Sequence, residues 1–178
     1  MFLKKVFLTL LGNLIKMTEK IPGSFYQKNY PKYLKMRGID ICTELRGGGQ
    51  EYIAPSAYFD GANYSMIHIG GGGVTISKDV VMLTHDYSIA KGLSYKYGSG
   101  TENVKKFQKE IKIGANCFIG ARSIILPGTD IGDNTIVGAG SVVKGKYKGN
   151  CVICGNPAKE VATIDEWVNR HIEKKDFE

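Results

Sequence analysis

Aliphatic residues recur at every sixth position in the C-terminal half of the chain, at Ile113, Ile119, Ile125, Ile131, Val137 and Val143. Glycine follows four of them directly. A small residue comes four positions after each of the first five, namely Cys117, Ser123, Thr129, Thr135 and Ser141. A period of six does not fit the 3.6-residue repeat of a helix, in which each glycine would also cost ~1 kcal/mol. The pattern predicts flat faces joined by tight corners, with the aliphatic and small side chains pointing inward.

The upstream half repeats less regularly. Ile53 and Phe59 lie six residues apart, as do Ile76 and Met82, whereas Ile69 is displaced by one position. We therefore expect two sections of coil, roughly 50 to 85 and 111 to 155, with each aliphatic residue stacked on the one a full coil away. The glycine beside each aliphatic residue indicates either a crowded corner or a positive φ.

Residues 86–110, between the two sections, keep no period and are rich in lysine and glycine. A stretch of this length without a pattern is uncommon inside a compact domain and is often functional. We expect it to protrude from the coil as a loop. It begins directly after His85, which ends an apolar run.

The first seventeen residues carry one helical stripe of apolar positions, at Leu3, Phe7, Leu10, Leu14 and Met17. The uncharged run from Val6 to Ile15 is shorter than the ~20 residues that span a bilayer, and no cleavage site of small residues follows it. The stripe predicts packing on the domain or on a neighbouring subunit, with contact to a membrane surface as the alternative.

A second apolar stripe, at Ile164, Trp167, Val168 and Ile172, predicts a helix near the C-terminus. The expected organisation is an N-terminal helical and irregular segment over 1–49, the coil domain over 50–162, and a C-terminal helix over 163–178.

Composition narrows the choice of partner only slightly. The net charge of +7 suits anionic small molecules, a membrane surface or nucleic acid, and selects none of them. Cys151 and Cys154 form a C-x-x-C pair without a second pair or a nearby histidine, so we expect free thiols in a reducing compartment and no metal.

Three stretches carry a family resemblance: the repeats from Ile111 to Val143, "THDYS" at 84–88 and "GNPAK" at 155–159. Together they resemble the hexapeptide-repeat acetyltransferases over about residues 50–162. The similarity is to the maltose, galactoside and xenobiotic branch and to the sugar O-acetyltransferases of capsule and lipopolysaccharide. It implies an all-β core, a left-handed parallel β-helix with the protruding loop and the terminal helices. It also implies a cytoplasmic homotrimer whose active sites are shared by two neighbours.

The resemblance implies that His85 is the catalytic base. Acetyl transfer to a hydroxyl requires a group that removes a proton near neutral pH, and imidazole suits this task. No serine or cysteine lies in a recognisable nucleophile motif, so we expect direct attack by the acceptor hydroxyl. Asp86 is left out of the catalytic set because adjacent strand residues point to opposite faces, and a backbone carbonyl would orient the imidazole equally well.

Three polar residues about one coil before His85 are candidates for binding sugar hydroxyls: Asp60, Asn63 and Tyr64. The same "DGAN" segment is also typical of a simple turn, so the sequence leaves both interpretations open.

The resemblance also implies a set of acetyl-CoA contacts. Phe118 and Ala121 would lie near the thioester, and Ala139 would lie beside the pantetheine arm. Lys144 and Lys159 would lie toward the nucleotide. The sequence departs from the family pattern at Gly145, where a lysine is usual.

We therefore expect an acetyl-CoA-dependent O-acetyltransferase that acts on a sugar hydroxyl, in a surface glycan or its precursor. The partners are acetyl-CoA, that acceptor and two further copies of the chain, without nucleic acid, and with a possible peripheral contact of the N-terminal helix to a membrane. The alternatives are a streptogramin-type or serine acceptor, or a β-helical scaffold without catalysis.

Overall fold

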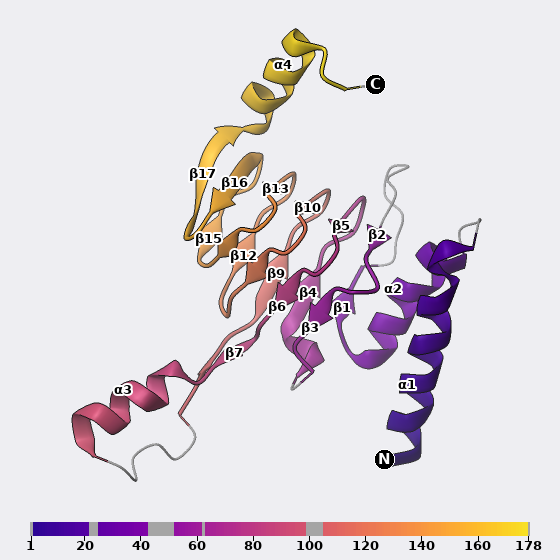
Figure 1. The fold of residues 1–178 in the computed structure, drawn as a ribbon, viewed down its shortest axis with the longest axis vertical. Helices are drawn as coiled ribbons and strands as arrows, with labels where there is room; N and C mark the ends of the chain where they lie inside the picture. The colour runs from indigo at the N-terminus through magenta and orange to yellow at the C-terminus, as the bar shows by residue number, and fades with distance from the viewer. Residues whose placement is uncertain (1, 22–24, 43–51, 62, 99–104, 178) are drawn as a thin grey trace.

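The computed structural model describes residues 2–21, 25–42, 52–61, 63–98 and 105–177. Short parallel strands wind into a three-sided prism, and each side is one sheet (Figure 1). Successive strands visit the three sides in turn, so that each full turn places a strand beside its counterpart from the turn before. This is the coil that the six-residue period predicts.

We name the three sides faces A, B and C. Face A contains β1 (Asp40–Ile41), β4 (Ile67–Ile69), β9 (Ile111–Ile113), β12 (Asp130–Ile131) and β15 (Lys146–Tyr147). Face B contains β2 (Tyr52–Ile53), β5 (Thr75–Ile76), β10 (Phe118–Ile119), β13 (Ile136–Val137), β16 (Cys151–Gly155) and the antiparallel β17 (Ala158–Thr163). Face C contains β3 (Tyr58–Phe59), β6 (Val81–Met82), β11 (Ile124–Ile125) and β14 (Val142–Val143). The first strand, β1, lies upstream of the expected coil boundary at residue 50.

The core is built from columns of inward side chains that stack in register from coil to coil. On face C the column is Phe59, Met82, Ile125 and Val143. The equivalent column on face B is Ile53, Ile76, Ile119, Val137 and Ile153. These side chains are buried, and so are the small residues that come four positions after the aliphatic ones. The predicted stacking is confirmed.

The repeated glycines lie where the next coil leaves no room for a side chain. A Cβ atom on Gly114, Gly120 or Gly132 would lie 2.3–2.5 Å from the backbone of the next coil. The left-handed backbone instead falls at the corners, at positions such as Asn116 (φ 51°) and Asn134 (φ 54°). Of the two explanations that the sequence left open, crowding therefore applies to these three glycines.

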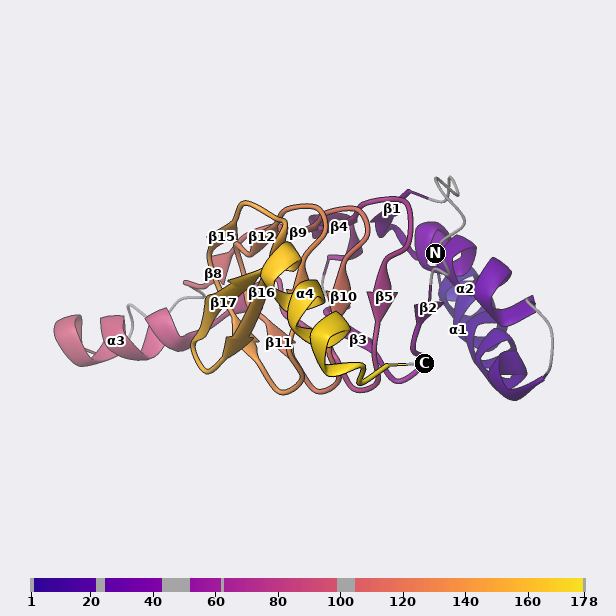
Figure 2. The same cartoon turned by 90° about the horizontal axis from the view of Figure 1, so that it is seen from above.

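A helical hairpin covers the first coil. It consists of α1 (Phe2–Met17), the short helix η1 (Thr18–Lys20) and α2 (Phe25–Arg37), and it lies at one end of the prism (Figures 1 and 2). Tyr26, Tyr30 and Leu34 of α2 are buried in the same cluster as the coil aliphatics. The Tyr26 hydroxyl donates to the Ile53 carbonyl over 2.6 Å, which fastens α2 to β2.

The apolar stripe predicted for α1 does not pack on its own chain. Leu8 and Ile15 form the buried side of α1, whereas the stripe residues are 60–81% exposed: Leu3, Phe7, Leu10, Leu14 and Met17. Among the described helices, none is long and apolar enough to cross a membrane.

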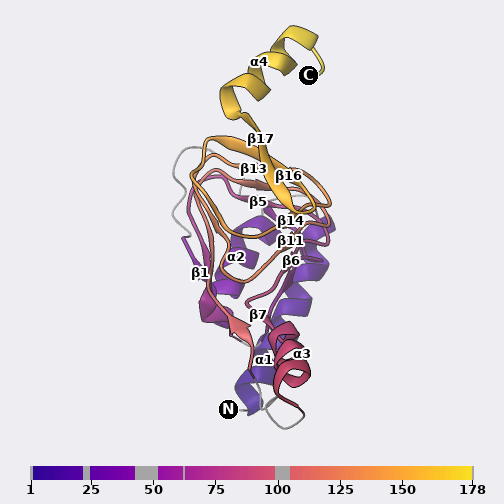
Figure 3. The same ribbon diagram turned by 90° about the vertical axis from the view of Figure 1, so that its left-hand side faces the viewer.

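The opposite end of the prism carries α4 (Ile164–Lys174), which rises beyond the last coil (Figure 3). Thr163 and Glu166 form a capping box at its start, in which each side chain accepts from the other residue's backbone N–H. Val168 and Ile172 of its apolar stripe are exposed.

The segment over 86–110, expected as a loop, contains regular structure. β7 (His85–Asp86) and β8 (Phe107–Gln108) pair antiparallel, and α3 (Ser88–Tyr97) projects from them, away from α1 and α2 (Figure 2). The Asp86 carboxylate accepts a hydrogen bond from the Ser88 backbone N–H over 2.8 Å at the start of α3. The helix has no buried residue, although Ile89, Leu93 and Tyr97 recur at helical spacing along it.

Candidate active site

His85 lies at the corner where the chain leaves face C. β6 (Val81–Met82) is the strand of face C that precedes this exit, and β7 begins at His85, three residues after Met82. The imidazole side chain is 26% exposed, and the Tyr87 ring meets it edge-on with 5.2 Å between ring centroids. The corner therefore presents a histidine that is partly enclosed yet still open to solvent.

Asp60 lies beneath this histidine, one coil earlier. Its backbone N–H donates to the Met82 carbonyl over 3.0 Å, which fixes the residue beside the strand that leads to His85. Its side chain is only 3% exposed. The same carboxylate oxygen accepts from the Thr84 backbone N–H over 3.0 Å, from the Thr84 hydroxyl over 2.7 Å, and from Nδ1 of His85.

This arrangement sets the chemistry of the imidazole. A buried aspartate that receives several donors is held as an acceptor, so the proton of the pair resides on Nδ1 of His85. Nε2 is then the nitrogen that has a free lone pair. A carboxylate on the far side of the ring also stabilises the imidazolium that forms when Nε2 takes a proton. The geometry leaves Nε2 of a fixed imidazole able to accept a proton from a bound group.

The three residues expected to bind the acceptor have different environments in the structure. Asp60 was expected to meet sugar hydroxyls, but its burial and its bonds to Thr84 and His85 place it behind the imidazole. Asn63 caps the short helix η2 (Tyr64–Met66), where its side-chain oxygen accepts from the Ser65 backbone and hydroxyl. The Tyr64 hydroxyl accepts from the Arg37 guanidinium over 2.9 Å.

The sequence contained the signal for Asp60 but not its role. Because Phe59 aligns with Met82 in the inward column, the next residue after Phe59 falls beside the end of β6. Asp86, the nearer acid, is bonded to the start of α3 instead. Its carboxylate keeps a pKa below the ordinary value, chiefly because it accepts the Ser88 backbone N–H.

A second histidine–aspartate pair lies on face A and differs in burial. Nδ1 of His68 lies 3.0 Å from the Asp40 carboxylate, but that carboxylate is 72% exposed. His171 likewise lies 2.7 Å from Asp176 on the exposed C-terminal segment. Only the His85 pair, among the described histidines, has a buried aspartate at a prism corner.

The expected coenzyme residues fall along two edges of the prism. Ala121 and Ala139 follow β10 and β13 at the edge between faces B and C, and the Gly140 backbone N–H donates to the Ala121 carbonyl over 2.8 Å. Phe118 of β10 lies just before that edge and is 44% exposed. Lys159 is exposed on β17, in register with Cys154.

Lys144 lies on the other edge, between faces C and A. Its Nζ stands 5.9 Å from the centroid of the Phe107 ring, and both residues line a cavity of about 110 Å³ with Asp86 and Lys109. Face C therefore separates Lys144 and His85 from the other expected coenzyme residues within one chain.

Known proteins resemble this chain in sequence and in fold. A family model described as "Hexapeptide repeat of succinyl-transferase" matches residues 110–144. The galactoside O-acetyltransferase of Escherichia coli (strain K12) is 30% identical over 143 residues, which cover 73% of this chain and 68% of that protein. The chain belongs to the hexapeptide-repeat acetyltransferases. It is an acyltransferase, and the family resemblance of the sequence is confirmed.

Solved structures establish the hand of the coil. The maltose O-acetyltransferase from Clostridium difficile 630 superposes with a TM-score of 0.59 and 24% identity, covering 88% of this chain and 84% of that one. A galactoside acetyltransferase in complex with coenzyme A superposes with a TM-score of 0.52 and 21% identity, covering 91% and 83%. The fold is the left-handed parallel β-helix that the sequence predicted.

Proposed function

We propose that this acyltransferase moves an acetyl group from acetyl-CoA to a hydroxyl of a sugar, in a surface glycan or its precursor. His85 is the general base in this proposal. The observation that carries it is the Asp60 carboxylate, which is buried and bonded to Nδ1 of a partly exposed imidazole. A relative named as a galactoside O-acetyltransferase and a fold neighbour named as a maltose O-acetyltransferase support the sugar acceptor.

In the proposed step the acceptor oxygen bonds to the acetyl carbonyl carbon while Nε2 of His85 takes the hydroxyl proton. The carbon–sulfur bond then breaks, and the departing thiolate of coenzyme A recovers that proton from the imidazolium. Asp60 stabilises the positive charge during this interval. A positioned base of this kind contributes typically 10²–10⁴-fold.

The edge between faces B and C suits an extended coenzyme arm. Gly120, Ala121, Gly138 and Ala139 place only small residues at this edge over two successive coils, with the exposed Arg122 beside them. Lys159 lies toward one end of it and supplies positive charge for the nucleotide, as the family pattern implies. Acetyl-CoA binding is supported by the fold neighbour that was solved with coenzyme A.

The two edges meet if copies of the chain pack through face C. Its outward column is apolar, with Tyr58, Val81, Ile124 and Val142 in register. A parallel sheet that is apolar on both sides is normally covered on both sides. In a closed ring of three copies, the edge with His85 and Lys144 of one copy would lie against the edge with Ala121 and Ala139 of the next. We therefore propose a homotrimer with shared active sites.

The exposed stripe of α1 has two possible partners in this scheme. A neighbouring copy in the trimer is the one we favour, because a ring can bury such stripes without open ends. A fully active monomer would instead direct the stripe to a membrane surface. Residues 2–37 carry eight basic side chains and one acidic side chain, which suits anionic lipid.

The test is thiol release from acetyl-CoA with a panel of sugars, serine and streptogramins. Sugars should be acetylated, and His85→Ala should lower kcat by ~10²–10⁴-fold while coenzyme binding persists. Asp60→Asn should lower kcat and alter its pH profile, because a neutral amide cannot stabilise the imidazolium of His85 as a carboxylate does.

His68→Ala is the matched control, since it removes the coil histidine that pairs with the exposed Asp40. Its activity should stay within about twofold of the parent protein, because no step is assigned to His68. Near-normal turnover of His85→Ala would remove the base assignment. Transfer to serine or to a streptogramin alone would replace the sugar acceptor.

A further inference from the structure

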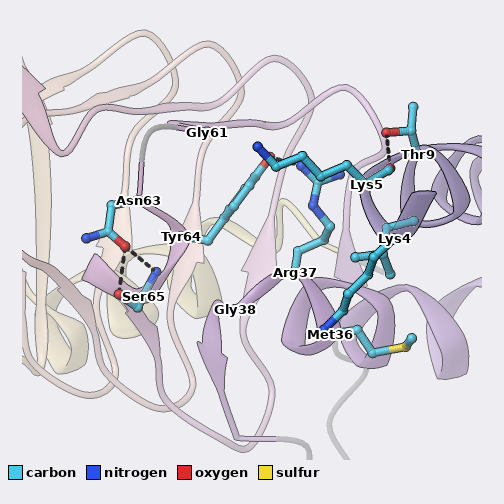
Figure 4. Close-up of a pocket in the computed structure, with 11 residues that line it drawn as sticks. Lys4, Lys5, Thr9, Met36, Arg37, Gly38, Gly61, Asn63, Tyr64 and Ser65 are labelled. Atoms are coloured by element: carbon cyan, nitrogen blue, oxygen red, sulfur yellow. Dashed lines mark hydrogen bonds between the residues drawn. The ribbon is translucent and has the colours of Figure 1, made fainter. Parts of the chain in front are cut away.

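Two adjoining cavities lie between the helical hairpin and the first coil. The larger, of about 600 Å³, is lined by residues of α1, by the end of α2, and by Gly61, Asn63, Tyr64 and Ser65 (Figure 4). The smaller, of about 220 Å³, shares Thr9, Arg37 and Tyr64 with it. We call the larger cavity, with Arg37 at its boundary to the smaller one, the hairpin pocket.

The described walls of both cavities carry cations without acids. Lys4, Lys5 and Arg37 line the larger cavity, and Lys16 lines the smaller. Neither described lining contains Asp or Glu, and no carboxylate of the described residues lies within ion-pair distance of these four side chains. Burial, followed by the charge of Arg37, lowers the pKa of Lys16.

Arg37 is held rigidly in this wall by neutral partners. Its guanidinium donates to the Tyr33 and Tyr64 hydroxyls, both over 2.9 Å, and lies 4.7 Å from the centroid of the Tyr64 ring. Figure 4 shows Lys5 and Arg37 both extending toward Tyr64. A guanidinium that is already fixed loses little conformational entropy when it binds an oxyanion. The tyrosines are neutral, so they leave its positive charge uncompensated.

The hairpin pocket is also connected in sequence to the proposed catalytic pair. Gly61 and Asn63 line the pocket, and Asp60, which holds His85, directly precedes them. Three residues of fully extended chain span at most ~11 Å, so the Asn63 backbone lies within that distance of Asp60. The lining of the pocket therefore begins at the residue that follows Asp60 in the chain.

We propose that the hairpin pocket binds an oxyanion, a phosphate or carboxylate, carried by the acceptor sugar. This inference rests on the proposed function and narrows its acceptor class to acidic sugars. Asn63, Tyr64 and Ser65 add neutral hydrogen-bonding groups to the same wall. Lys4 and Lys5 are exposed cations of the same wall, whereas Arg37 is fixed by two hydrogen bonds.

The kinetic test compares acceptors with and without an acidic group. N-acetylglucosamine is compared with its 1-phosphate, and galactose with galacturonate. The parent protein should show a KM at least tenfold lower for one or both charged members, and the pair that responds distinguishes phosphate from carboxylate. Raising the salt concentration from 0.05 to 0.5 M should shrink this preference, because exposed charges are screened.

The variant Lys4→Gln/Lys5→Gln should reduce the preference for the charged acceptor at least fivefold. Lys28→Gln/Lys32→Gln removes two cations from α2 outside the pocket and should retain the preference. Equal loss in both double variants would show a general field effect and overturn the site. Equal KM values for the charged and neutral members would overturn the inference while sugar acetylation still upheld the proposed function.

A binding experiment keeps the inference testable if no sugar is acetylated. Calorimetric titration with N-acetylglucosamine 1-phosphate should show saturable binding to the full chain that weakens at least fivefold in Lys4→Gln/Lys5→Gln. Binding that is absent, or unchanged in this variant, overturns the oxyanion site whatever the catalytic assays give.

Discussion

Faces A and C of the prism share one architecture on the inside and differ on the outside. Both stack aliphatic residues inward, with Ile113 and Ile131 on face A and Ile125 and Val143 on face C. The outward column of face C is apolar throughout. The outward column of face A is Asp40, His68, Lys112, Asp130 and Lys146, in register.

The difference separates folding from recognition. Because side chains alternate across a strand, the core fixes only the inward positions and leaves the outward ones free. On face A, Asp130 lies between Lys112 and Lys146, so opposite charges meet in register and the sheet suits water. Face C has no such charges in its column and adjoins the edge that carries His85. In the proposed trimer, its outward residues specify the neighbouring copy, whereas its inward residues specify the coil.

The largest loss of stability should come from mutations in the inward columns, which faces A and C build in the same way. Ile125→Ala on face C and Ile131→Ala on face A each remove a fully buried side chain. Each should lower the free energy of unfolding by roughly 2–5 kcal/mol, since a cavity replaces packed methylenes. Urea unfolding of both variants at the same protein concentration measures this. A substantially larger loss on one face would contradict the view that the two inward columns are equivalent.

These columns are also where sequence reasoning succeeded. Strict spacing from Ile113 to Val143 located every inward position, because each coil of this section repeats the same three strands and corners. The upstream coils were located less well. The glycines from Gly71 to Gly73 lie where the spacing between Ile69 and Ile76 departs from six residues. β1 pairs with β4, but no six-residue repeat connects the two strands in the sequence.

The site was predicted only in part, for a related reason. The "THDYS" motif located His85, but a motif states neither burial nor partners. Asp60 became recognisable as the group behind the imidazole only when β3 and β6 were paired. The hairpin pocket could not be foreseen, since Arg37 and Tyr64 meet through packing of α2 on the first coil.

An intermediate effect should follow from breaking face C alone. Ile124→Lys places a cation in the middle of the apolar outward column, where assembly would bury it without a partner. We expect sedimentation equilibrium to show loss of the trimer, and activity to fall at least tenfold if sites are shared.

Lys112→Gln is the control for that variant, on an outward position of face A. It should remain trimeric and active, because face A is left in solvent. A fully active Ile124→Lys monomer would contradict both the trimer and the shared site. It would also favour a membrane surface, instead of a neighbouring copy, as the partner of the α1 stripe.

The smallest effect should arise on the outside of face A. Asp130→Asn removes the negative charge between Lys112 and Lys146 and leaves the two lysines with a neutral neighbour. Exposed charge pairs contribute about 0–1 kcal/mol, so the free energy of unfolding should fall by no more than about that amount, and less at high salt. Paired urea titrations at 0.05 and 0.5 M salt measure the change. Because face A is assigned to solvent, the trimer and the turnover should be unaffected. A loss of assembly in Asp130→Asn would mean that the charged ladder, and not the apolar column of face C, meets the neighbouring copy.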